Sequence, residues 1–272
     1  MPMAYKIRRS SLPILPSRAA DIRILHFSDL HLTPKRNWLI RDIKSWVNLK
    51  PDLIISTGDL IAHKEAIEPL INSLGSLLEI PGLFVFGSND YYAPRFRNPI
   101  TYLIPDKGER RFGEKLDWKF LEKELSKSGW KSLIHKKENI TINGVTIEVR
   151  GTDDAHLELD NYSLVAGQVG KEADVSFGVT HAPYKRVLAA MAQDELDVVF
   201  AGHTHGGQIR LPWPGGSKAL TTNCDLETWR ASGLSKINDE PWLNVSAGMG
   251  YNPYAPIRIS CPPEVSLITL TA

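Results

Sequence analysis

The chain has 272 residues, of which 42% are hydrophobic and 23% are charged, and its formal net charge is +1. This composition is that of an ordinary globular protein, and a chain of this length can bury a core without disulfides. The net charge gives no global field that would favour nucleic acid or an anionic surface. Two cysteines are too few for a disulfide framework, so we expect a reducing, cytoplasmic location.

The N-terminal region contains Arg8-Arg9, a pair that also occurs in export signals. Pro13 and Pro16 interrupt the apolar stretch that follows, so we expect no signal sequence there. Residues 5–15 are instead predicted to form an edge strand, where prolines are tolerated. No apolar run approaches the roughly 18 residues that a membrane-spanning helix requires.

Strands and helices are predicted to alternate over the next part of the chain. Short apolar runs at 22–27, 53–55 and 83–86 indicate strands, and residues 37–49 and 65–79 have helical spacing. Strands that are separated by helices of this length pair in parallel through right-handed crossovers. The pattern therefore predicts an α/β fold.

Residues 91–116 interrupt this alternation, because they are rich in Tyr, Pro, Arg and Lys and have no clear periodicity. A helix is expected at about 117–128. We interpret residues 91–135 as a lid-like excursion from one domain that spans residues 1–272. A flexible loop is the alternative for the irregular part.

The second half of the chain contains further strands and a helix. Asn143-Gly144 predicts a tight hairpin turn between two strands. A helix is expected at about 184–193, and the remaining strands are expected at 175–180, 196–201, 208–211, 242–245 and 265–270.

Histidine, aspartate and asparagine directly follow the predicted strands. Alone, an Asp-x-His occurs by chance and a Gly-Asp is often only a turn. In α/β sheets, however, sites form beyond the carboxyl ends of strands, so these side chains are expected to converge. Such mixed ligands suit Mn, Fe or Zn, and seven of them suit two ions that share a carboxylate. The blocks are Ser28-Asp29-Leu30-His31, Gly58-Asp59, Gly87-Ser88-Asn89-Asp90, Thr180-His181 and Gly202-His203-Thr204-His205.

In order and spacing, these blocks resemble those of the calcineurin-like metallophosphoesterases, in the branch that ends in Gly-His-Thr-His-Gly-Gly-Gln. The resemblance covers positions 29–205, and flanking strands extend it over most of the chain. It implies a four-layer αββα sandwich, in which two mixed β-sheets are flanked by helices. It also implies two divalent metal ions (Mn, Fe or Zn) and a metal-bridging hydroxide that attacks phosphorus in line.

The resemblance assigns roles to individual residues. Asp59 resembles the carboxylate that bridges the two metals. The other ligands fall into two sets: Asp29, His31 and His205 resemble ligands of the first metal, and His181 and His203 resemble ligands of the second.

The third block departs from the family pattern, which is Gly-Asn-His-Asp. An ungapped comparison places Ser88 on the metal-binding asparagine and Asn89 on the histidine that assists the leaving group. A shift of one residue makes Asn89 the metal ligand and gives Asp90 the other place. We favour Asn89, because an amide oxygen coordinates better than a neutral hydroxyl. In either register the histidine is missing, and Asp59, Asn89 and Asp90 are the candidate catalytic residues.

Candidate substrate contacts follow the third block. Arg95 and Arg97 could clamp a second phosphate, or they could belong to a solvated loop surface. Tyr91 could line the pocket, or it could be a core aromatic residue.

The sequence predicts a metal-dependent phosphoesterase that acts on a small-molecule phosphoester. A phosphodiesterase or pyrophosphatase is expected, with a nucleotide-linked, lipid or cell-envelope substrate, because the branch resembles enzymes of that kind. A phosphomonoesterase is the alternative within the fold, and a scaffold protein without metals is the alternative outside catalysis. Peripheral membrane contact through residues 91–116 is also conceivable. No nucleic-acid partner is expected, and no oligomeric state is predicted.

Overall fold

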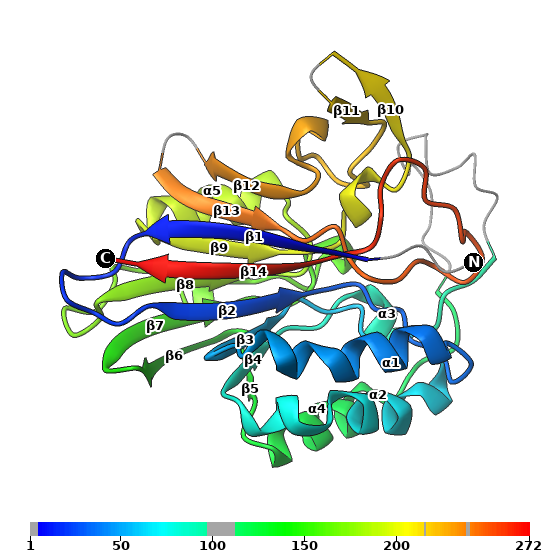
Figure 1. The fold of residues 1–272 in the computed structure, drawn as a ribbon, viewed down its shortest axis with the longest axis horizontal. Helices are drawn as coiled ribbons and strands as arrows, with labels where there is room; N and C mark the ends of the chain where they lie inside the picture. Colours follow the sequence, from blue (N-terminus) through cyan, green and yellow to red (C-terminus); the bar gives the residue numbers. More distant parts are fainter. Residues whose placement is uncertain (1–4, 97–111, 215, 238–239) are drawn as a thin grey trace.

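The computed structural model describes residues 5–96, 112–214, 216–237 and 240–272 (Figure 1). The strands are β1 (Lys6–Pro13), β2 (Ile22–Phe27), β3 (Leu53–Ser56), β4 (Gly82–Phe84), β5 (Lys131–Ser132), β6 (Lys136–Ile142), β7 (Val145–Gly151), β8 (Val175–Val179), β9 (Val198–Ala201), β10 (Arg210–Trp213), β11 (Gly216–Ala219), β12 (Gly233–Ile237), β13 (Glu240–Val245) and β14 (Glu264–Thr271). The helices are α1 (Asn37–Ser45), α2 (Ile67–Leu74), α3 (Ser88–Tyr91), α4 (Trp118–Lys127) and α5 (Lys185–Gln193).

Two mixed sheets form the centre of the molecule. The first has the strand order β1-β14-β2-β3-β4-β5, and the second has the order β12-β13-β9-β8-β7-β6. In the first sheet β2, β3, β4 and β5 are parallel and β14 is antiparallel to β2. In the second sheet β7, β8, β9 and β13 are parallel, whereas β6 and β12 run antiparallel to their neighbours. The strands that precede the candidate site, β2, β3, β4, β8 and β9, belong to the parallel part of each sheet.

The two sheets pack face to face through one hydrophobic cluster. Strand β2 shows how alternation divides its side chains: Ile22 and Ile24 enter the layer between the sheets, and Leu25 and Phe27 enter the layer on the opposite side. Because strand side chains alternate between faces, a strand that is apolar on both sides must be covered on both sides. The partners of Ile24 across the inner layer come from the second sheet and include Val149, Phe177 and Phe200.

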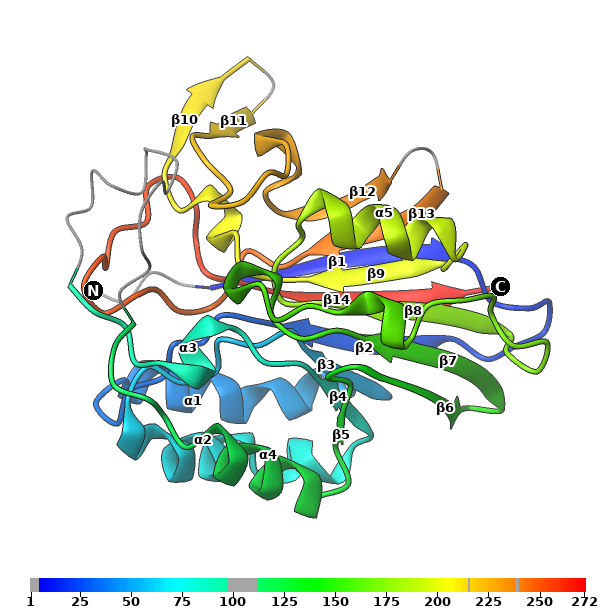
Figure 2. The ribbon, with the colours of Figure 1, turned by 180° about the vertical axis from the view of Figure 1, so that it is seen from behind.

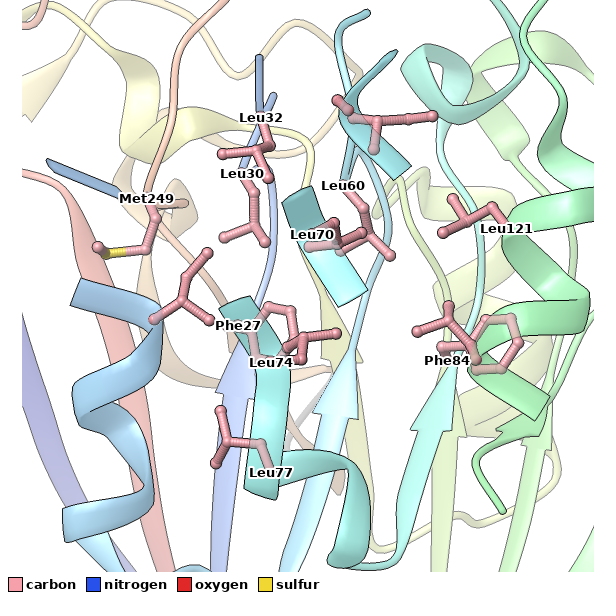
Figure 3. Packing of buried hydrophobic residues seen from close by; sticks show 14 of the residues in the cluster. Phe27, Leu30, Leu32, Leu60, Leu70, Leu74, Leu77, Phe84, Leu121 and Met249 are labelled. Atoms are coloured by element: carbon pink, nitrogen blue, oxygen red, sulfur yellow. The ribbon is translucent and has the colours of Figure 1, made fainter. Parts of the chain in front are cut away.

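Helices cover the two outer faces. Figures 1 and 2 show α1, α2 and α4 together on the outer face of the first sheet and α5 on the outer face of the second. Phe27 and Phe84 of the first sheet pack against leucines of α2 and α4 (Figure 3). Helix α5 contributes Val187, Leu188 and Met191 to the core beside β9 and β13. The predicted helix–sheet–sheet–helix sandwich is confirmed.

Several predicted elements have different bounds in the structure. The helical stretches at 37–49 and 65–79 are short α-helices flanked by 3-10 turns, such as Trp46–Leu49 after α1. The strands β5, β11 and β12 were not predicted, because they are short or carry no regular apolar alternation.

The segment 91–135, interpreted as lid-like, divides into unlike parts. Residues 97–111 lie outside the described residues. Further along, Leu116, Leu121 and Leu125 are buried in the core cluster over the first sheet, and β5 extends that sheet. A lid at 91–116 stays a prediction. No helix in the described ranges is both long and apolar enough to cross a membrane.

Candidate metal centre

The candidate ligands follow parallel strands of both sheets. Asp29 and His31 follow β2, Asp59 follows β3, and Asn89 lies in α3 after β4. From the second sheet, His181 follows β8, and His203 and His205 follow β9. Backbone hydrogen bonds join the loops after β2 and β3, since the N–H of His31 donates to the carbonyl of Asp59 over 2.9 Å. The two sheets therefore bring the loops of one end together.

The backbone of this region is held in a conformation that L-residues rarely adopt. Five candidate ligands have a positive φ between 41° and 69°, and they are Asp29, His31, Asp59, His203 and His205. Such angles cost free energy and persist at functional sites where the surrounding structure enforces them. These backbone angles let each side chain turn toward the centre of the site soon after its strand ends.

Close approach also requires glycine at two places. A Cβ atom on Gly87 would collide with Asp59 Oδ1 and with the ring of His181. A Cβ atom on Gly202 would collide with Ser28 Oγ. The φ of Gly202 is not positive, so glycine is required there only for space beside Ser28 and Asp29.

The ligand atoms form two groups that share Asp29. One group contains Asp29, His31 and His205, and the other contains Asp29, Asp59 and His181. The two oxygens of Asp59 face histidines of different groups: Oδ2 lies 3.5 Å from His31 Nε2, and Oδ1 lies 3.7 Å from His181 Nε2. His203 belongs to neither group, but its ring lies edge-on to that of His181 at a centroid distance of 5.2 Å.

Several buried atoms at this centre have no hydrogen-bond partner within the described part of the chain, among them Asp29 Oδ1 and His181 Nε2. Both residues are 0% exposed. A buried polar atom without a partner is costly, and unpaired atoms of this kind in a native protein call for an unseen ligand. The donor set of carboxylates and imidazoles is that of a transition-metal site.

The electrostatics of the pocket favour a cation. Burial raises the pKa of Asp29 to about 6. Burial alone would lower the pKa of His181, but the carboxylates of Asp59, Asp154 and Asp29 raise it to about 9. The charges of His181 and His31 in turn hold the pKa of Asp59 below its usual range, although burial acts in the opposite direction. A divalent ion bound here would neutralise the negative charge of the same carboxylates.

Two of the histidines have their tautomers set by backbone carbonyls. The Nδ1 of His181 donates to the carbonyl of Thr57 over 2.6 Å, which leaves the lone pair on Nε2 directed into the site. The Nε2 of His203 lies 3.0 Å from the carbonyl of Asn223, so in this arrangement Nδ1 is the nitrogen that would be available to bind a metal ion. Hydrogen bonds of this kind orient metal-binding histidines and raise their basicity.

In the third block, Ser88, Asn89 and Asp90 each make different contacts. The backbone N–H and the side-chain Nδ2 of Asn89 each lie 2.7 Å from an oxygen of Asp59. The hydroxyl of Ser88 lies 3.4 Å from the same amide. Asp90 is fully buried, and its carboxylate accepts N–H groups of Asp59, Gly87, Leu60 and Ile61 over 2.7 to 3.3 Å. Asp90 therefore ties the loop after β4 to the loop after β3.

Two buried arginines fix the loops that carry the first group. The guanidinium of Arg36 donates to the carbonyls of His31 and Tyr251, each over 2.9 Å. Arg258 donates to the carbonyls of His205 over 3.3 Å and of Gly250 over 2.6 Å. Sequence reasoning missed both residues, because a single arginine in a loop carries no pattern.

Of the three candidate substrate contacts, Tyr91 and Arg95 lie within the described residues. Tyr91 is 7% exposed and donates its hydroxyl to Asp153 over 2.6 Å. It also lines a cavity of about 370 Å³ with Trp118, Tyr92 and Lys115, and none of the candidate metal ligands lines this cavity. Tyr91 is therefore a largely buried aromatic residue, and its contact with substrate stays a prediction. Arg95 donates to the carbonyl of Phe112 on the surface. Arg97 lies outside the described residues.

His156 is a further imidazole at the centre, and its ring lies 4.6 Å from that of His203. Asp154 is fully buried, and burial raises its pKa to about 7. Its charge is one of those that raise the pKa of His181.

Comparison with known proteins agrees with this geometry. The model of the calcineurin-like phosphoesterase family matches residues 22–207. An uncharacterized metallophosphoesterase of Aquifex aeolicus is 26% identical over 98% of this chain and 90% of its own length. The UDP-2,3-diacylglucosamine pyrophosphatase LpxG of Chlamydia muridarum is 28% identical over 93% of this chain and 86% of its own. The family model matches more than half of the chain, and the candidate ligand groups lie within the matched residues. The chain therefore belongs to the calcineurin-like phosphoesterases, a family of metal-dependent phosphoesterases.

Proposed function

We propose that this protein hydrolyses phosphodiester or pyrophosphate bonds with two divalent metal ions held between its two sheets. The observation that carries the proposal is the position of Asp59, whose two oxygens face histidines of the two ligand groups. A carboxylate in that position can bind both ions at once. Two divalent ions bound in this way would supply an activated water and stabilise the charge that develops on a phosphoryl group.

We assign the ligands in two sets. The first ion would be held by Asp29, His31 and His205, and the second by His181 and His203 together with Asn89. Asn89 is preferred to Ser88, because its amide lies directly against Asp59 and amide oxygen is the stronger ligand. The amide that here donates to Asp59 would turn its oxygen toward the second ion. Manganese, iron and zinc all suit this donor set.

Asp90 is better described as a positioning residue than as the catalytic residue proposed from the sequence. Both of its oxygens accept backbone N–H groups of the loops that carry Asp59 and Gly87. Its carboxylate therefore holds Asp59 in place.

The third block also bears on the leaving group. No histidine stands at the place in Gly87-Ser88-Asn89-Asp90 from which relatives of the family assist the departing oxygen. A leaving group of low pKa, such as a nucleotide or a phosphorylated alcohol, needs that assistance least. This favours a phosphodiester or pyrophosphate over an ester of a simple alcohol.

The named relatives point in the same direction. The Chlamydia muridarum protein is named as a pyrophosphatase of a nucleotide-linked lipid precursor. We therefore place nucleotide-linked lipid or envelope intermediates first among substrates, and expect the protein to act in the cytoplasm at the membrane surface. A phosphomonoesterase of the same fold is the second candidate.

A hydrolysis screen with Mn²⁺ tests the proposal. The substrates are bis(p-nitrophenyl) phosphate, UDP-linked sugars and p-nitrophenyl phosphate, with the D59N protein as the control. We expect turnover of the diester or of the UDP conjugates that exceeds that of the monoester. Faster turnover of the monoester would favour the phosphomonoesterase. Fewer than one bound ion per chain, together with no turnover, would favour a metal-free scaffold.

A further inference from the structure

An amphipathic ribbon rises from the rim of the metal centre. Strands β10 and β11 form a two-stranded hairpin that projects away from both sheets (Figures 1 and 2). The segment before β14 pairs with the base of the hairpin, because the N–H of Arg210 donates to the carbonyl of Ile259 and the N–H of Ile259 donates to the carbonyl of Gln208. We call this unit, residues 208–214 and 216–220 with 257–259, the ribbon.

The two faces of the ribbon have different chemistry. On the inner face, Arg210 pairs across the hairpin with Ala219, which is 2% exposed, and the Arg210 guanidinium donates to the carbonyl of Gly206 over 2.9 Å. The side-chain alternation of a strand sends the neighbouring residues to the opposite face. That outer face is apolar, with side chains that are between 42% and 60% exposed: Leu211, Trp213, Leu220, Ile257 and Ile259.

A cation completes the outer face near the tip of the ribbon. Lys218 stands opposite Leu211 in the hairpin register, and its ammonium lies 5.2 Å from the centre of the Trp213 ring. Tryptophan beside lysine is the combination that sits at a bilayer interface, where the ring enters the headgroup region and the ammonium reaches lipid phosphates.

Among the described residues of the outer face, Lys218 is the exposed cation, because Arg210 donates toward the inner face and Arg258 is buried. Residues 206–224 contain Arg210 and Lys218 and no aspartate or glutamate, and residues 250–263 contain Arg258 and no aspartate or glutamate. These 33 positions would hold three or four acidic residues at the average frequency of the chain, which has 31 in 272. An exposed apolar face without carboxylates is complementary to a surface of anionic lipid.

The ribbon is continuous with the metal centre. Strand β10 begins five residues after His205, and the chain after β11 reaches Asn223, whose carbonyl accepts the Nε2 proton of His203. A surface that docks here would lie next to the ligand groups.

We propose that the outer face of the ribbon docks on an anionic phospholipid bilayer and holds the opening of the metal centre against the membrane surface. The alternation of apolar side chains, the tryptophan–lysine pair and the missing carboxylates together favour a lipid surface over a protein partner. Delivery of an amphiphilic phosphoester to the metals is a consequence that rests on the proposed function. Docking itself does not rest on the proposed function, because it is measured without substrate.

Flotation with large unilamellar vesicles tests the docking. The full chain is mixed with vesicles of phosphatidylcholine alone or with about 30% phosphatidylglycerol. We expect flotation with the anionic vesicles and much weaker flotation with the neutral ones. The substitution Lys218→Glu should lower the partition onto anionic vesicles at least about fivefold. The pair Leu211→Ser and Trp213→Ser should lower it about tenfold or more.

A matched control carries exposed apolar side chains elsewhere. Phe120 in α4 and Leu164 are 45% and 63% exposed, and Phe120→Ser with Leu164→Ser should float as the wild-type protein does. All variants are compared at equal metal content and equal Tm, so that a folding defect is recognised. Quenching of tryptophan fluorescence by brominated phosphatidylcholine should fall in Trp213→Phe.

Three results would overturn the proposal. One is absence of flotation with every vesicle, and another is equal flotation of the ribbon and control variants. The third is a dimer, seen by light scattering, that the ribbon substitutions dissociate without altering vesicle binding, because it would make a second copy of the chain the occupant.

Discussion

The Nε2 atoms of His31 and His205 lie 3.0 Å apart, although 174 positions separate the two residues in the chain. Their rings are stacked with a centroid distance of 4.9 Å. Two imidazole lone pairs that face each other at this distance are held together by a shared proton or by a cation. Asp29 Oδ1 lies 3.6 Å from His205 Nε2 and adds a negative charge to the same point. The relationship places this pair in the candidate ligand group that also contains Asp29.

Replacement of Asp59 by Asn tests the bridge. The amide retains only one oxygen, so it cannot serve two ions at once. We expect bound metal to fall from two ions per chain to one or fewer, with loss of phosphoesterase activity. Elemental analysis of the purified protein measures this. Asp174→Asn, which alters a surface carboxylate that accepts the N–H of Thr146, should keep both ions. Two ions and full activity in D59N would contradict the bridging assignment.

The register of the third block is decided by a pair of single substitutions. Asn89→Ala should lose the second ion, because it removes the amide that lies 2.7 Å from Asp59. Ser88→Ala should keep both ions, since it removes only a hydroxyl. Metal titration with a chelator competitor measures the two affinities. Loss of metal in S88A alone would reverse the assignment and place the serine hydroxyl on the ion.

Asp90→Asn tests whether Asp90 holds the neighbouring loops in position or takes part in the reaction. The amide presents an NH2 group to backbone N–H donors that now meet a carboxylate oxygen. A buried donor without a partner costs about 1–3 kcal/mol, so we expect a loss of unfolding free energy of that size. Asp52→Asn is the control, because Asp52 accepts the backbone N–H of Arg23 outside the site. A kcat that falls while stability is unchanged would show that Asp90 takes part in the reaction directly.

Arg258→Lys tests the support of the first ion site. Lysine keeps the charge but cannot reach the carbonyls of His205, Ala247 and Gly250 together. Loss of such a supporting contact typically lowers metal affinity about 10–100-fold. We expect that loss to affect the first ion more than the second. Arg8→Lys, which alters the ion pair with Glu264, should leave both affinities unchanged.

His26 gives the stability a pH dependence that can be isolated. It is fully buried, with Thr57 and Asn244 as partners, and burial lowers its pKa to about 3. The unfolded chain takes up a proton below about pH 6.5, whereas the folded chain does so only near pH 3. The contribution of His26 to stability is therefore present above pH 6.5 and is lost as the pH falls.

Denaturant unfolding with a chelator, at pH 6.5 and pH 5.0, measures this loss against His26→Gln, which cannot titrate. The wild type should lose about 2 kcal/mol more than the variant over this interval. Other titrating groups are common to both proteins and cancel in the comparison. An equal loss in both would show that His26 takes up a proton in the folded state.

The sequence by itself determined which residue types stand at the ends of the strands. Apolar runs of strand length predict β2, β3, β8 and β9, because both faces of these strands are buried. The polar residue after each run then has to lie at one end of a sheet. The order and spacing of these residues carry the resemblance to the family, and the resemblance in turn implies the candidate ligands. The strand β5 could not be foreseen, because its two residues take their structure from β4.

Only the tertiary structure decided what surrounds those ligands. Arg36, Arg258 and the carbonyl of Asn223 reach the site from loops, where no periodicity marks them. Asp90, next to Asn89 in the chain, points to backbone N–H groups rather than to the ligands. The ribbon, too, becomes a single face only when Ile259 pairs beside β10. Local sequence determines strands and their ends, whereas contacts between distant loops depend on how the two sheets pack together.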